Sequence, residues 1–384
     1  MSRIEFYRHQ LGDDEAQAWR KVLGTLFLTL GPEVAAFESE LAAYLARGRD
    51  SSAKSHVVGV SCCSMGLLLA LRAFDVGPGD EVITTPMTFA ATANAVLHLG
   101  ATPVLVDVEK GTGLIDPNAV RAAIGPRTKG LLPVHLYGQL ADMRALRAIA
   151  DERKLFVLED SAHGVEIERD GVRPGDLGEA AVFSFYATKN LTSGDGGAIV
   201  TRDAKIAERL RRLRNHGVSK AAADRHGSDY QHWDLVELGY KANLTDLDAA
   251  LLRIQLPKVD EKRARREQVA RRYEARLREA VPGVEFIEPR GTSSHHLYPI
   301  LAPRGERDQV LSRLGAAQIG TAVNYRAIHT LTYLKEILRI PRGALPIAEE
   351  IGDRTISLPM YPTLTEAEQD RVVAAVADAW PRGA

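Results

Sequence analysis

The sequence predicts an α/β fold with a large, mostly parallel sheet and a smaller α+β region at the C-terminal end. Short apolar runs alternate with helical stretches from residue 56 to about residue 200, which is typical of a parallel sheet covered by helices on both faces. The length of 384 residues suits a large domain plus a smaller one. We therefore expect a large domain over residues 1–255 and a small one over residues 256–384.

Composition and charge exclude several classes of protein. Lys plus Arg number 49 and Asp plus Glu number 50, giving a net charge of −1, so nothing favours binding to nucleic acid or to an anionic membrane. The only cysteines, Cys62 and Cys63, are adjacent, so neither a disulfide framework nor a metal site is expected. The N-terminus has no apolar signal core, and no apolar run could span a bilayer. We expect a cytoplasmic protein.

The first elements predict a possible phosphate site. Two helices, at about Glu15–Leu28 and Pro32–Leu45, precede a short strand at His56–Val60. The residues from Ser61 to Gly66 are all small except Met65, and a helix follows through Phe74. A strand, a tight turn and a helix N-terminus can bind phosphate through backbone N–H groups, although many such turns bind nothing.

The following units continue the alternation. The predicted strands are Glu81–Thr85, Pro103–Val106, Gly130–Val134 and Leu155–Leu158, and the predicted helices are Phe89–Leu99 and Ala141–Arg153. Ligands of such sheets bind beyond the carboxyl ends of the strands. The polar residues expected at that edge are Ser61–Ser64, Pro86–Phe89, His135, Glu159–Asp160 and Lys189.

The pattern changes after Arg202. The sequence predicts a basic helix at Lys205–Arg214, a long polar segment at Asn215–Tyr240, a helix at Asp246–Gln255 and a charged helix from Pro257 to about Ala280. Val284–Trp380 mixes short strands and helices. A polar segment of that length is usually functional or contacts a partner.

Lys189 lies in the most informative stretch. The apolar run Ala180–Tyr186 predicts a buried strand, a polar loop with one lysine and three glycines follows, and Ala198–Val200 begins the next strand. A lysine there could reach a cofactor and form a Schiff base. It could equally be a solvated lysine in a glycine-rich hairpin.

Three further residues carry a functional and a structural interpretation. Asp160 ends a strand and could pair with a protonated pyridine nitrogen, or it could cap a helix. Phe89 could stack on a flat ring, or it could be ordinary core. His163 could bond a ring hydroxyl, or it could be a structural histidine.

Motifs along nearly the whole chain resemble the DegT/StrS-type sugar aminotransferases. They are Gly59–Ala73, Gly77–Ile83, Thr88–Asn94, Pro133–Gly138, Glu159–His163, Phe183–Phe185, Lys189–Thr192, Leu213–Gly217, Leu238–Asp246 and Ile356–Pro359. The resemblance implies a pyridoxal phosphate (PLP) enzyme of fold type I, the aspartate-aminotransferase fold.

The resemblance also implies roles for residues. Lys189 would be the Schiff-base lysine and proton shuttle, Asp160 the partner of the pyridine nitrogen, and Phe89 the stacking residue. His163 would lie beside the ring hydroxyl. Cys63, Ser64 and Ser184 match the phosphate-binding positions, where the family's usual Gly-Thr turn is replaced by Cys63-Ser64. Asn243, or else Lys241, would reach the phosphate of the neighbouring subunit, which implies a homodimer with shared sites.

A narrower resemblance concerns the substrate. Gly239–Asp246 and Asn324–Thr330 are similar to the aminotransferases that act on UDP-4-keto-pentose in lipid A modification. It implies a UDP- or dTDP-linked 4-keto sugar as acceptor, glutamate as amino donor, and Lys241 and His329 near the substrate.

Alternative functions share this fold. A cyclitol (inosose) aminotransferase of antibiotic pathways has the same core motifs. A PLP-dependent sugar dehydratase would have histidine in place of Lys189. A regulatory protein that lost turnover would not need Lys189, Asp160 and Ser184 together.

Overall fold

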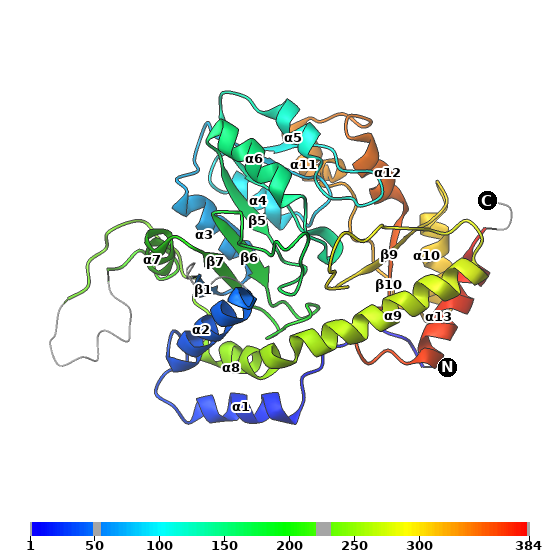
Figure 1. Cartoon of the computed structure of the whole chain (residues 1–384), viewed down its shortest axis with the longest axis horizontal. Coiled ribbons are helices and arrows are strands. Elements are labelled where there is room, and N and C mark those ends of the chain that lie inside the picture. The colour runs from blue at the N-terminus through cyan, green and yellow to red at the C-terminus, as the bar shows by residue number, and fades with distance from the viewer. Residues whose placement is uncertain (1, 49–54, 220–231, 382–384) are drawn as a thin grey trace.

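The computed structural model describes residues 2–48, 55–219 and 232–381, and its centre is a seven-stranded sheet (Figure 1). The strand order is β1-β7-β6-β5-β4-β2-β3. The strands are β1 (His56–Val60), β2 (Glu81–Thr84), β3 (Thr102–Leu105), β4 (Thr128–Leu132), β5 (Phe156–Asp160), β6 (Ala180–Ser184) and β7 (Gly197–Thr201). Only β7 pairs antiparallel with its neighbours, and the other pairs are parallel. The predicted α/β fold with a mostly parallel sheet is confirmed.

Alternate side chains of each central strand pack against different helices. In β6, Val182 packs with α3 (Cys63–Ala73) and α7 (Ala204–Leu213), whereas Phe183 packs with α2 (Pro32–Ala46) and α8 (Asp246–Gln255). In β7, Ile199 packs on the side of α3 and α7, and Val200 packs on the side of α2 and α8. Successive strand residues point to opposite faces, so a run that is apolar throughout is buried on both.

Two helices of the large sheet begin at an aspartate cap. Asp116 caps α5 (Pro117–Ala123), which was not predicted, and Asp142 caps α6 (Met143–Arg153). α4 (Ala91–Leu97) begins two residues later than predicted.

α1 (Asp13–Leu23) is shorter than the predicted helix at Glu15–Leu28. It ends at Gly24, and Thr25 turns back to bond the Val22 carbonyl through both its N–H and its hydroxyl. Leu26 and Leu28 therefore lie in an exposed loop.

The C-terminal part forms a second, three-stranded sheet ordered β10-β9-β8. Its strands are β8 (Glu285–Phe286), β9 (Tyr298–Leu301) and β10 (Thr355–Leu358), and its helices are α10 (Arg307–Ala316), α11 (Thr332–Leu338), α12 (Pro346–Arg354) and α13 (Glu366–Ala379). The long helix α9 (Val259–Ala280) begins after a 3-10 turn at Leu256–Lys258 rather than at Pro257.

Helix α9 joins the two parts of the molecule. Its first residue, Val259, packs with α2 and α8, whereas Val269, Tyr273 and Leu277 pack in the C-terminal core. The division between residues 255 and 256 stays a prediction. In the long polar segment, residues 220–231 lie outside the described part, and its flanks pair through Val218 and Leu235.

The described helices include none with the length and hydrophobicity needed to cross a membrane.

Candidate active site

The carboxyl ends of three strands bring the predicted site residues to one edge of the large sheet. β1 and β6 both end opposite Gly197, the first residue of β7, because Val60 and Ser184 pair with it. β5 ends beside them at Asp160. The turn after β1, Asp160, Ser184 and the Lys189 loop therefore meet at this edge, where parallel sheets bind ligands.

Lys189 faces the interior of this edge rather than solvent. Its side chain is half-buried and lines a small cavity with Ser184, His163 and His296. Its Nζ lies 3.3 Å from Nε2 of His296. Burial lowers the pKa of Lys189 to about 8, although the nearby Cys63 thiol and Asp160 carboxyl act in the opposite direction. Such an amine changes its protonation state near pH 8.

Asp160 is buried at the end of β5. Its Oδ2 accepts a hydrogen bond from Thr92 Oγ1 at 2.8 Å, and its Oδ1 accepts one from the N–H of Ala162 at 3.1 Å. Burial raises the pKa of Asp160, and these two bonds oppose the shift. A turn and then β6 follow, so the alternative in which Asp160 caps a helix has no support in the geometry.

The tautomer of His163 follows from its neighbours. Its Nδ1 accepts from the Tyr137 N–H at 3.1 Å, so in the neutral ring the proton lies on Nε2, which faces Tyr325 Oη at 3.1 Å. Burial lowers the pKa of His163 well below its ordinary value, which keeps the ring neutral. His163 therefore presents an N–H donor to the site.

The turn after β1 is built to expose backbone donors. The Sγ of Cys62 accepts from the Met65 N–H at 3.5 Å, which leaves the N–H groups of Cys63 and Ser64 at the start of α3 without an intrahelical acceptor. A Cβ at Gly197 would lie 2.8 Å from Cys62 C and from Cys63 N, so only glycine fits beneath the turn. Burial raises the pKa of the Cys63 thiol well above its ordinary value, so it stays neutral.

Aromatic side chains lie at the mouth of the site. Phe89 is 64% exposed, which excludes ordinary core packing, and its ring centroid lies 6.2 Å from that of Tyr325. Tyr186, three residues before Lys189, is 52% exposed. The hydroxyl of Ser184 accepts a long 3.4 Å bond from the Tyr186 N–H. A flat ring could lie against Phe89 from the solvent side.

Lys241 and Asn243 lie at the outer edge of β1. Asn243 pairs with Val60, and the Ser61 N–H bonds the Ala242 carbonyl. With its amide oriented to satisfy both neighbours, Asn243 donates to the Arg214 carbonyl at 2.9 Å and accepts from Lys241 Nζ at 2.6 Å. The segment thus runs beside the phosphate-type turn of its own chain.

Three residues predicted near the ligand have buried partners of their own in the structure. His329 is 1% exposed and bonds Glu349 at 3.1 Å, so this geometry gives no support to a contact with substrate. His135 and Glu159, expected at the ligand edge, form a fully buried pair at 2.9 Å. Glu159 also accepts from the Gly175 and Gly178 N–H groups, which indicates a structural role.

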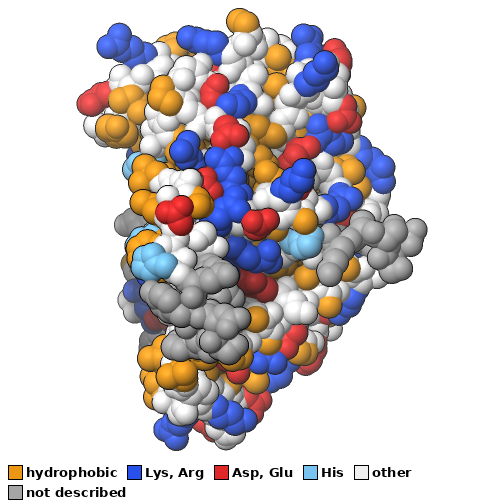
Figure 2. All heavy atoms as spheres, turned by 90° about the vertical axis from the view of Figure 1, so that its left-hand side faces the viewer, with side chains coloured by type: hydrophobic (Ala, Val, Ile, Leu, Met, Phe, Trp, Pro, Cys, Tyr) orange, Lys and Arg blue, Asp and Glu red, His pale blue; other side chains and the backbone are white. Residues whose placement is uncertain are grey.

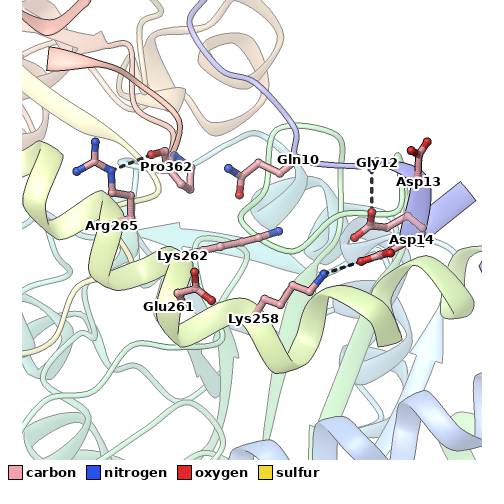
Figure 3. Close-up of a pocket in the computed structure, with 10 residues that line it drawn as sticks. Gln10, Gly12, Asp13, Asp14, Lys258, Glu261, Lys262, Arg265 and Pro362 are labelled. Atoms are coloured by element: carbon pink, nitrogen blue, oxygen red, sulfur yellow. Dashed lines mark hydrogen bonds and ion pairs between the residues drawn. The ribbon is translucent and has the colours of Figure 1, made fainter.

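A separate cavity of about 530 Å³ lies between the N-terminal segment and α9 (Figure 3). Lys262 points into it, toward Gln10. Lys258 is paired with Asp14 at 3.2 Å, and Arg265 bonds the Pro362 carbonyl at 3.2 Å. None of the residues gathered around Lys189 lines this cavity, so we assign it no part in the chemistry.

The fold and this edge fit a class of protein: an enzyme that uses PLP. The residues present fit the cofactor, because they offer an amine for its aldehyde, a carboxyl group, an N–H donor at His163, and helix N–H groups beside a glycine for its phosphate. Among the described residues, no group of three or more His, Cys, Asp or Glu could hold a metal ion.

Comparison with known proteins supports this class of enzyme. Residues 9–377 match the DegT/DnrJ/EryC1/StrS aminotransferase family, and the chain belongs to it. It is 39% identical to the spore coat polysaccharide biosynthesis protein SpsC of Bacillus subtilis (strain 168) over 376 residues, which are 96% of this chain and 95% of SpsC.

Solved structures give the same result. The chain matches DesV of S. venezuelae with a TM-score of 0.88 and 37% identity over 98% of each chain. It matches the PLP form of the putative sugar aminotransferase Spr1654 of Streptococcus pneumoniae with a TM-score of 0.88 and 26% identity, again over 98% of each chain. The predicted PLP fold type I, the aminotransferase activity and the PLP cofactor are therefore confirmed.

Sequence reasoning missed His296, Thr92 and Tyr325. His296 comes from the segment before β9, and Thr92 from α4. Thr92 and Tyr325 lie within the motifs Thr88–Asn94 and Asn324–Thr330, but the resemblance implied no role for them. His296 lies in none of these motifs, and its contact with Lys189 comes about only through folding.

Proposed function

We propose that this enzyme transfers an amino group from glutamate to a UDP- or dTDP-linked 4-keto sugar. One observation carries the site assignment: the Lys189 amine, the buried Asp160 carboxyl and the His163 N–H donor lie together at the ligand edge of the sheet. SpsC is named for polysaccharide biosynthesis, and a further similar structure, Helicobacter pylori PseC, is described as an aminotransferase of pseudoaminic acid biosynthesis. These names support a sugar acceptor.

Each residue then has a stated role. Bound PLP supplies an electron sink for the carbanion formed at the reacting carbon. Lys189 would hold the cofactor and, when its amine is free, move protons at that carbon through Nζ. Asp160 would hold the proton on the pyridine nitrogen, and His163 would donate to the ring hydroxyl oxygen.

The remaining roles concern binding. The turn at Cys63 and Ser64, with Ser184, would hold the phosphate, and Phe89 would cover the ring. Lys241 is exposed and remains a proposed contact for the substrate. The narrower likeness to UDP-4-keto-pentose aminotransferases rests on short motifs only, and the match to a spore coat protein does not favour it.

The alternatives differ in their acceptor. An inosose aminotransferase would need the same Lys189 site, whereas a sugar dehydratase of this fold would lack the lysine. Turnover with glutamate should be measured on a panel of UDP- and dTDP-4-keto sugars and inosose, with Lys189→Ala as the blank. Amination of a nucleotide sugar supports the proposal, and amination of inosose alone contradicts it.

We also propose a cytoplasmic homodimer with shared sites. Two exposed leucines precede the Lys241–Asn243 segment: Leu238 is 76% exposed and Leu235 60%. Leu26, in the loop after α1, is 78% exposed. Exposed large apolar side chains favour an interface. Figure 2 faces the side of the molecule with α7 and has hydrophobic side chains among Lys and Arg there.

Complementation tests the sharing of sites. In a hybrid of Lys189→Ala and Asn243→Ala subunits, one site would be intact if Asn243 serves the neighbouring site. Part of the activity should then return on mixing. If Asn243 serves its own site, both sites of the hybrid carry a defect and no activity returns in a mixture shown to exchange subunits.

A further inference from the structure

The segment just before β9 has two faces. Ser294 and His296 point toward Lys189 and His163, whereas Ser293, His295 and Leu297 line a separate cleft. The backbone turns locally here, because His295 has a positive φ of 46°. Two adjacent histidines thus meet different environments, and only His296 faces the proposed active site.

The ring of His296 has a single polar contact. Its Nε2 lies 3.3 Å from Lys189 Nζ, and its Nδ1 is buried without a hydrogen-bond partner among the described residues. His296 is 8% exposed, and burial lowers its pKa well below the ordinary value, which keeps the ring neutral. A neutral ring with the proton on Nδ1 leaves Nε2 free to accept from Lys189.

The backbone that carries His296 is held from several directions. The Ser294 carbonyl accepts from Arg266 Nε at 2.8 Å and from Asn190 Nδ2 at 3.2 Å. Arg266 forms a buried ion pair with Glu166 at 2.6 Å, and Asn190 also bonds Glu166. Asn190 directly follows Lys189. The lysine and the histidine are therefore held by one common hydrogen-bond network. This network keeps Lys189 Nζ and His296 Nε2 within hydrogen-bonding distance of each other.

We propose that His296 is a positioning residue for the Lys189 amine: its Nε2 accepts a hydrogen bond from Nζ whenever that amine is not bonded to the cofactor. This inference rests on the proposed role of Lys189. An acceptor at Nε2 fixes where Nζ points and favours its ammonium form over the neutral amine, because bonds from charged donors are the stronger ones.

Other ionisable groups near Lys189 and His296 also shift the pKa of these two side chains. Cys63 and Asp160 favour the Lys189 ammonium, and burial disfavours it. His163 and Arg266 lie near His296 and disfavour its protonation, as does Lys189 itself. None of them provides a hydrogen-bond acceptor to Nζ among the described contacts. Loss of the His296 acceptor should therefore lower the pKa of Lys189.

The test uses the apoenzyme, so it does not depend on knowing the sugar. Trace acetylation with acetic anhydride between pH 6 and 10, read at the Lys189 peptide by mass spectrometry, gives the pKa of this amine. His296→Leu should lower the midpoint by about one pH unit, a tenfold change in the ammonium-to-amine ratio. His296→Gln, which keeps an acceptor at similar reach, should stay near wild type. His295→Gln is the matched control and should equal wild type.

Two further arms complete the design. If His296→Leu does not fold, His296→Asn takes its place, because its shorter side chain cannot reach Nζ. In turnover with any accepted amino donor, His296→Leu should lower kcat more than it raises KM. An unchanged midpoint in both His296→Leu and His296→Asn, or an equal shift in His295→Gln, would overturn the proposal. Failure of sugar turnover alone would contradict the proposed substrate and leave the labelling result intact.

Discussion

Asp160 and Glu159 are neighbours in β5 with opposite environments. Asp160 faces the ligand edge, where Thr92 and Ala162 donate to it. Glu159 faces the other side, where it pairs with His135. Strand alternation therefore separates a carboxyl group available for chemistry from one that stabilises the fold.

The first prediction contrasts these two carboxyl groups. Asp160→Asn should lower turnover by two to four powers of ten, or roughly 3–5 kcal/mol at about 1.4 kcal/mol per tenfold, because the charge facing the ring nitrogen is lost. Its melting temperature should change little, since the amide keeps the shape and an acceptor. Glu159→Gln should instead lower the melting temperature and leave turnover near the wild-type value. Wild-type turnover in Asp160→Asn would contradict its assigned role.

The second prediction concerns the pH dependence set by Lys189. Burial lowers its pKa to about 8 in the folded apoenzyme. Between about pH 8 and the ordinary lysine value near 10.4, the unfolded chain binds a proton here that the folded chain lacks, so this residue adds stability as pH rises.

The measurement compares apoenzymes. Lys189→Met should be more stable than wild type at pH 7, and the difference should shrink as pH rises through this window. Urea unfolding at pH 7, 8, 9 and 10 checks it. A difference that grows or stays constant would show that Lys189 is solvated.

Local sequence predicted some site residues and missed others for a physical reason. Asp160, Lys189 and the turn at Cys63 lie where a strand ends, and a strand end is recognisable from an apolar run. His296 lies 107 residues from Lys189 and follows no such run. Its role exists only because the C-terminal part folds against the large sheet.

At the scale of elements, α9 connects the C-terminal core to the Lys189 loop. Arg266, in the middle of α9, reaches Glu166 and the Ser294 carbonyl, and both groups also bond Asn190. From the sequence alone, the Arg and Glu content of this helix predicts a solvated face. That prediction was wrong for Arg266, which is 2% exposed, because charge alone does not reveal a buried partner.

The third prediction tests this connection. Arg266→Met leaves Glu166 buried and unpaired, so it should cost about 3–5 kcal/mol of unfolding free energy. Adding Glu166→Gln removes that charge and should recover part of the loss. Arg278→Met breaks an exposed pair with Glu274 and should change stability by less than about 1 kcal/mol. Equal losses for Arg266→Met and Arg278→Met in urea unfolding would contradict the argument.

Strand and helix positions were largely predictable, whereas strand direction and helix ends were less so. β1 and α8 lie where apolar periodicity placed them. β7 runs antiparallel to β6, and residues 185–196 between them form a loop without the helix that a parallel crossover usually contains. α1 ends early because Thr25 bonds back to Val22, a local competition that periodicity does not reveal.

At the scale of the whole molecule, the proposed dimer interface includes the exposed leucines at positions 26, 235 and 238. The fourth prediction is that Leu238→Asp shifts the protein from dimer to monomer in light scattering and lowers activity with it, because a charge cannot be buried unpaired. Ile337→Asp changes a 41% exposed residue on α11 and should leave the dimer intact. A wild-type monomer, or dissociation by both variants alike, would contradict the assigned interface.

The most direct measurement is the site of cofactor attachment. Purified protein loaded with PLP should be yellow, and after borohydride reduction and proteolysis the mass of the cofactor should appear on the Lys189 peptide. Lys189→Ala should bind no covalent cofactor, while Lys262→Ala, which changes a lysine of the separate cavity, should label like wild type. Attachment at another lysine, or at none, would contradict the assignment of this edge of the sheet as the active site.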